Sequence, residues 1–184
     1  NHNIQFLCDE HHTGKSFIPL ELSNYKLENI EVSEYNINSS IIFAPSNLIS
    51  KWKYKLENFC NNEYFIIQDY KDFKKLIINN KFKYKKQDLT TRQISKILIN
   101  KTINEYDKNN IGIFNIDKLK KFKLILIPTE YYSRFQLYAW LSNLKFDRFF
   151  FDNIFNCYND EYILNFKPNN AYKIYFITTK YKYL

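Results

Sequence analysis

The sequence predicts an α/β fold in which helices cover both faces of a mostly parallel sheet. Short apolar runs without polar alternation recur along the chain, as is typical of strands buried on both faces. Segments with helical spacing separate these runs, which favours alternating strands and helices. The first run leads into "LCDEHHTGKS", residues 7–16, which lies after its strand, where such sheets bind ligands.

The predicted strands are the apolar runs bounded by polar segments. They lie at 4–7, 41–44, 64–67, 124–127, 149–151 and 174–177. A helix is predicted after the second run, because one helical stripe holds Leu48, Trp52, Leu56 and Phe59. Ser46 or Asn47 is its expected N-cap.

A second helix is predicted after Thr129, with Glu130 in the favourable first turn. Its stripe holds Tyr131, Phe135, Tyr138 and either Leu141 or Ser142. The least regular stretch, 81–121, is basic at both ends and brackets a possible helix at 92–103 and an Asn-rich turn at 107–110. We interpret it as an insertion in a single domain that spans residues 1–184, because no internal repeat or Pro-, Gly- or Ser-rich linker divides the chain.

Composition bounds the class of protein. A chain that is 45% hydrophobic and 19% aromatic is not disordered. The formal charge of +8 favours a polyanionic partner such as nucleic acid, although the codon bias of an AT-rich genome also enriches lysine. Cys8, Cys60 and Cys157 lie far apart and indicate buried thiols in a reducing compartment.

No apolar run approaches the roughly 20 residues that cross a bilayer, and no secretion signal is visible. We therefore expect an intracellular protein, not secreted and not a membrane protein. The sequence has no Met and begins a few residues before its first motif, so we expect a piece of a longer protein.

That motif, "LCDEHHTGKS" at 7–16, ends like a phosphate-binding loop, with Asp9 at the position of the first glycine. In such loops backbone N–H groups face the phosphates, a Lys neutralises them and a hydroxyl binds Mg²⁺. Thr13, Gly14, Lys15 and Ser16 fill the end of the pattern and are the predicted nucleotide-binding residues.

The same stretch has a zinc interpretation through Cys8, Asp9, His11 and His12. A structural zinc site needs four well-placed ligands. Neighbouring histidines point apart in a regular chain, and His2 is the remaining imidazole. We therefore expect no zinc.

The later segments resemble the motifs of superfamily 2 helicases, in order. "IIFAPSNLISKWKYKLENF", 41–59, is similar to motif Ia, most closely the "APxxLIxxWxxExxKF" form of Swi/Snf-type translocases. "LCDEHHTGKS" then resembles motif I, usually "LADEMGTGKT", and "KLILIPTEYYSRF", 123–135, resembles motif Ib.

"FDRFFFDNIFNCYND", 146–160, resembles motif II, "WDRVIIDEAHRIKN", and "YKIYFITTKYKYL", 172–184, resembles motif III. The ordered set covers nearly the whole chain outside 81–121. The resemblance implies the first RecA-like domain of such an enzyme, a three-layer P-loop NTPase fold that binds ATP and Mg²⁺, with Ser16 and Asp152 on the metal.

Several departures fall at the implied nucleotide site. Asn153 stands where motif II has the Glu that deprotonates the attacking water. Loss of a general base costs about 10²- to 10⁴-fold in rate, or about 3 to 5 kcal/mol of barrier. Phe155 replaces the family's His, Lys180 and Tyr181 replace the end of motif III, and His12 replaces a Gly.

The resemblance also implies contacts with a nucleic-acid backbone that read no sequence. Ser46 and Asn47 match the motif Ia turn, Thr129 and Glu130 match that of Ib, and Lys51 and Lys53 add positive charge. Such binding is expected to be weak, since the family closes its groove with a second RecA-like domain.

We therefore expect a degenerate helicase domain that serves as a nucleotide- or nucleic-acid-binding scaffold in a replication or transcription assembly. The AT-rich bias suggests a viral protein, located in the cytoplasm, a viral factory or the virion. The alternatives are a slow ATP-dependent helicase or translocase in which Asp160, Glu161 or a residue outside this chain compensates for Asn153, and a metal-binding module.

Overall fold

A computed structural model describes residues 4–9, 14–28, 33, 35–78, 113–153 and 170–179. Within these residues, six strands form one sheet in the order β1-β8-β7-β2-β6-β3, and every neighbouring pair is parallel. The strands are β1 (Ile4–Asp9), β2 (Asn36–Ala44), β3 (Tyr64–Ile66), β6 (Leu124–Pro128), β7 (Lys145–Asp152) and β8 (Ala171–Thr179).

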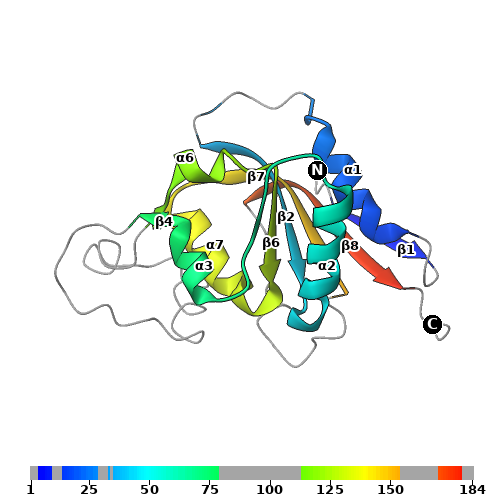
Figure 1. Cartoon of the computed structure of the whole chain (residues 1–184). Helices are drawn as coiled ribbons and strands as arrows, with labels where there is room; N and C mark the ends of the chain where they lie inside the picture. Colours follow the sequence, from blue (N-terminus) through cyan, green and yellow to red (C-terminus); the bar gives the residue numbers. More distant parts are fainter. Residues whose placement is uncertain are drawn as a thin grey trace.

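Helices pack on both faces of this sheet (Figure 1). One face lies under α1 (Ile18–Asn24), which continues the short helix η1 (Lys15–Phe17), and α2 (Ser46–Phe59). The other face lies under α3 (Tyr70–Lys75), α6 (Ile116–Leu119) and α7 (Tyr132–Leu141), the last preceded by η2 (Thr129–Tyr131). The predicted fold class, a three-layer RecA-like α/β fold, is confirmed.

The central strands send alternate residues to the two faces. In β2, Ile42 and Ala44 join the cluster under α1 and α2, whereas Ile41 and Phe43 join the cluster under α3 and α7. We call the first the site face and the second the aromatic face. Because both faces are covered, both sets of side chains are apolar, and the strand shows no alternation in the sequence.

Strand β2 begins earlier than its apolar run predicted. It starts at Asn36, and the polar residues Ser39 and Ser40 are buried within it. The Ser39 hydroxyl donates to the backbone oxygen of Phe122, and the Ser40 N–H donates to that of Lys123 over 2.8 Å. Strands β7 and β8 likewise begin with residues outside their predicted runs.

Strand β1 differs from its prediction in burial. It forms as expected, but Ile4 and Phe6 are exposed, Phe6 by 60%. The reason is position, since β1 lies at the end of the described sheet and pairs with β8 alone. Apolar content therefore predicted the strand correctly, and the expectation of burial on both faces was wrong.

Helix α2 begins differently from the prediction. Pro45 occupies the N-cap position, and no side chain caps the helix, so the predicted capping role of Ser46 or Asn47 is wrong. The Ser46 hydroxyl donates instead to the carboxylate of Glu130. Trp52 is buried as predicted, whereas Phe59 is 54% exposed.

The predicted second helix is confirmed as η2 followed by α7, with Phe135 and Tyr138 buried. The end of the predicted insertion belongs to the domain body, because Phe114 in β5 (Ile113–Phe114) and Leu119 in α6 are fully buried. Strand β5 pairs antiparallel with β4 (Ile77–Ile78). The rest of that segment, with the predicted 92–103 helix and 107–110 turn, lies outside the described residues.

The thiols are less buried than predicted. Cys8 is exposed and Cys60 is half-buried, and both are free; Cys157 lies outside the described residues. Among the helices described, none has the length and apolar character needed to span a membrane.

Candidate functional site

The sheet order gathers the ends of three predicted motifs at one edge. Strands β1 and β7 flank β8, with Asp9 opposite Thr179 and Asp152 opposite Ile177. All three strands are parallel, so their carboxyl ends, at Asp9, Asp152 and Thr179, lie at the same edge of the sheet. In open α/β sheets this carboxyl edge is where ligands bind.

The loop from motif I enters its helix through Gly14. This glycine has φ 79°, in the left-handed region, directly before η1, and its carbonyl accepts the Phe17 N–H over 2.8 Å. A residue with a β-carbon adopts that conformation at a cost of about 1–2 kcal/mol. Lys15 and Ser16, half-buried, follow at the start of the helix. Thr13, His11 and His12 lie outside the described residues.

Asp152 ends β7 with its side chain on the site face. Its Oδ2 atom accepts a hydrogen bond of 2.8 Å from Nε1 of Trp52, which is only 1% exposed. Burial raises the pKa of the Asp152 carboxyl, against the lowering effects of the Trp52 bond and the charges of Lys55 and Lys15. The charge of the predicted phosphate lysine, Lys15, thus favours the ionised form of the predicted metal-site carboxylate.

Lys55 also lies at this site, although the sequence motifs did not predict it. Its Nζ donates to Oγ of Ser16 and lies 5.2 Å from the ring centroid of Trp52 and 5.7 Å from that of Phe17. Burial lowers the pKa of Lys55, and the charge of Asp152 opposes that shift. We call Ser16, Trp52, Lys55 and Asp152 the Lys55 cluster.

Two features of the sequence could have indicated Lys55. It lies three residues after Trp52, and residues at that spacing share one face of a helix. The motif Ia form "APxxLIxxWxxExxKF" also has Glu at the position of Lys55, so this chain reverses the charge there. The two lysines that were predicted to add positive charge, Lys51 and Lys53, are both exposed on α2.

Asn153, the residue after Asp152, has φ 53°. This is a left-handed conformation that Asn tolerates better than most residues. Its backbone N–H donates to the Ile177 carbonyl over 2.9 Å, which fixes the turn after β7 to β8. The position next to Asp152 thus carries an amide, which is not a general base. Thr178 is half-buried at the end of β8; Phe155, Asp160, Glu161, Lys180 and Tyr181 lie outside the described residues.

The predicted nucleic-acid residues also meet at the carboxyl edge, at the ends of β2 and β6. Ala44 pairs with Pro128, so the turns that hold Ser46 and Thr129 are adjacent. Asn47 and Lys51 are exposed on the first part of α2. The bond between Ser46 and Glu130 places a carboxylate between these turns, and a carboxylate repels a phosphate backbone.

The metal interpretation of motif I gains nothing from the described residues. Cys8 is exposed on β1, and its proposed partners His11 and His12 are not described. No group of three or more His, Cys, Asp or Glu side chains that could hold a metal ion occurs in the described part of the chain.

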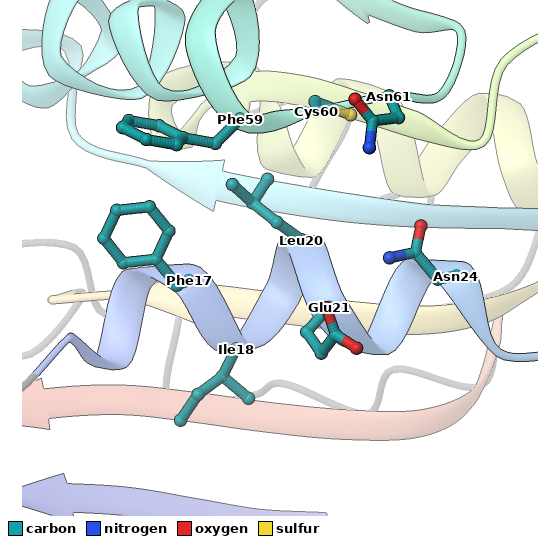
Figure 2. Close-up of a pocket in the computed structure, with 8 residues that line it drawn as sticks. All are labelled: Phe17, Ile18, Leu20, Glu21, Asn24, Phe59, Cys60 and Asn61. Atoms are coloured by element: carbon teal, nitrogen blue, oxygen red, sulfur yellow. The ribbon is translucent and has the colours of Figure 1, made fainter.

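A pocket of about 360 Å³ lies beside the cluster, between α1 and the end of α2 (Figure 2). Phe17 and Phe59, which both line it, contact one another edge to face, with ring centroids 5.1 Å apart. Lys15, Ser16 and Asp152 do not line it. We assign the candidate site to the edge that carries those three residues, because their chemistry suits phosphate and the pocket lining does not.

A scan against models of protein families finds no match for this chain, and a search of curated proteins finds no similar sequence. The helicase resemblance therefore rests on the order of the motifs in the sequence.

Proposed function

We propose that this chain is a nucleotide-binding domain of helicase type in which hydrolysis is weakened. The observation that carries the proposal is the convergence, at one sheet edge, of Lys15 and Ser16 from motif I with Asp152 from motif II. These residues are more than 130 positions apart in the chain, and a shared ligand is a simple reason for them to meet.

The proposed ligand is ATP, held mainly through its phosphates. Gly14 supplies the left-handed turn that brings the backbone of the loop into the helix, and Lys15 neutralises phosphate charge. Asn153 offers no base to deprotonate the attacking water, so turnover is expected to fall by about 10²- to 10⁴-fold relative to a Glu at that position. Binding without rapid turnover suits a scaffold or a nucleotide-controlled switch.

Nucleic-acid binding is the second part of the proposal. The adjacent turns at Ser46 and Thr129 offer hydroxyls to a backbone, and Lys51 offers charge. Glu130 opposes this, so we propose weak, sequence-independent binding that a second RecA-like domain or a protein partner would strengthen. A replication or transcription assembly, in the cytoplasm or a viral factory, is the setting that this function suits.

The test is ATP binding and turnover by the purified chain, with and without Lys15→Ala. We expect the variant to lose about tenfold or more in ATP affinity, as for the loss of a charge-assisted hydrogen bond. Lys71→Ala is the matched control, because Lys71 is an exposed lysine on α3, over the opposite face. Equal affinities of the Lys15 and Lys71 variants would contradict the proposal.

Turnover separates the proposal from an active helicase or translocase. We expect hydrolysis by the native chain to be slow and Asn153→Glu to raise it, because the variant restores a carboxylate beside Asp152. Rapid, nucleic-acid-stimulated ATP turnover by the native chain would contradict the scaffold function and indicate an active helicase or translocase.

A further inference from the structure

The two predicted magnesium ligands have other partners in this structure. A phosphate-loop site binds Mg²⁺ through the hydroxyl of its last residue, here Ser16, and through a motif II carboxylate, here Asp152. The Ser16 hydroxyl accepts a hydrogen bond from the ammonium of Lys55. One oxygen of Asp152 accepts a hydrogen bond from Trp52.

Both partners come from one face of α2. Trp52 and Lys55 are three residues apart, and the Lys55 ammonium lies over the indole of Trp52 and near the ring of Phe17. Aromatic faces attract a cation, and Trp52 is held in the core with 1% exposure. The ammonium is therefore positioned by packed side chains and is not a free surface charge.

The charges at this edge are unfavourable for a divalent cation. Lys15 and Lys55 both interact electrostatically with Asp152, and the neighbouring Asn153 carries no charge. Two basic side chains thus act on one carboxylate. Mg²⁺ prefers several oxygen ligands in near-octahedral geometry, and here it would meet the positive charge of Lys55, which is hydrogen-bonded to Ser16 and acts electrostatically on Asp152. The residues present do not fit the metal.

We propose that Lys55 is a built-in cation that replaces Mg²⁺, so that this site binds nucleoside polyphosphate without a divalent metal. This inference rests on the proposed nucleotide-binding function and adds the form of nucleotide that the site takes. The Lys55 ammonium, hydrogen-bonded to Ser16 and electrostatically attracted to Asp152, would supply the positive charge and hydrogen bonds that the metal provides in an ordinary phosphate-loop site.

The experiment is a calorimetric titration of the whole chain with ATP, in a magnesium buffer and in a buffer with excess chelator. We expect the native chain to bind equally well in both, within about threefold, a difference of less than the 1.4 kcal/mol that a tenfold change represents. Lys55→Met keeps the apolar stem against the aromatic rings and removes the charge. In chelator this variant is expected to bind about tenfold more weakly.

Lys55→Arg should retain metal-independent binding, because it keeps the charge, and Lys71→Met controls for net charge on the far face. Native binding that requires Mg²⁺, or metal-free binding that Lys55→Met leaves unchanged, would overturn the inference while leaving the proposed function standing. An absence of ATP binding in both buffers would overturn the proposed function itself, and the inference with it.

Discussion

The two faces of the sheet are built from different side chains. On the aromatic face, Phe43 lies against Phe149 and Phe151 of the neighbouring strand and against Phe135 of α7, with ring centroids 4.9–5.5 Å apart. On the site face the same strands present mostly aliphatic residues to α1 and α2, and the aromatic Trp52 there directs a polar atom to Asp152. The aromatic face packs many rings among aliphatic side chains, whereas the site face uses a core residue, Trp52, to hold a carboxylate.

This difference indicates a division of roles. The buried cluster of the aromatic face includes none of the candidate site residues, so we assign it a role in stability. The site face holds the residues that lie near the carboxyl edge. Trp52 and Lys55 lie on α2, and Ser16 lies in η1, directly before α1. The predictions below, from the largest expected effect to the smallest, test that division.

The largest effect is expected from Phe43→Ala. Phe43 is fully buried among other rings, and such truncations cost about 3–5 kcal/mol of unfolding free energy. Denaturant unfolding of the native chain and the variant gives the difference. Phe59→Ala is the matched control, because that ring is 54% exposed on the site side. Comparable losses of unfolding free energy in the two variants would contradict the special role of the aromatic face in stability.

A smaller effect is expected from Trp52→Phe, which keeps an aromatic ring and removes the indole N–H. Asp152 then loses its 2.8 Å hydrogen bond while remaining half-buried, and an unsatisfied group of this kind costs about 1–3 kcal/mol. The measurement is again denaturant unfolding. Combining the substitution with Asp152→Asn tests the cause: strictly additive losses would show that the Trp52–Asp152 bond contributes nothing.

The smallest effect is expected at the rim of the aromatic face, from the pH dependence of the Asp72–Lys75 ion pair on α3, whose N–O distance is 2.6 Å. The hydrogen bond from Lys75 holds the pKa of Asp72 below its usual value. A depressed carboxyl pKa stabilises the fold above the unfolded pKa, and that stability is lost as the pH falls through the folded value. Unfolding of native chain and Asp72→Asn should therefore differ at neutral pH and converge in acid; a constant difference would refute the assignment.

The elements that local pattern determines were predictable from the sequence. Apolar runs located all six strands of the main sheet, and for central strands such as β6 the reason is burial on both faces, which needs apolar residues at every position. The helical stripe through Trp52 and Leu56 located α2. The start of β2 was not predictable this way, since Ser39 and Ser40 are polar and depend on backbone partners at Phe122 and Lys123 for their burial.

The candidate site was predictable only where the motif order supplied long-range information. Lys15, Ser16 and Asp152 were expected together, and the structure brings them to one edge. Lys55 was not, because its bond to Ser16 joins residues 39 positions apart and the Trp52–Asp152 bond joins residues 100 apart. No local periodicity contains such pairings, and the packing of α2 against the edge decides them.

Strand β1 has a consequence for how this domain would respond to a ligand. It leads into Gly14 and Lys15, yet in the described sheet it is held by β8 alone and its Phe6 is exposed. Segments with few buried contacts open at the lowest free energy, so β1 should exchange its amide hydrogens sooner than β2 or β7. A nucleotide bound by Lys15 would then stabilise the pairing of β1 with the sheet. Its binding should therefore slow the deuterium uptake of residues 4–9.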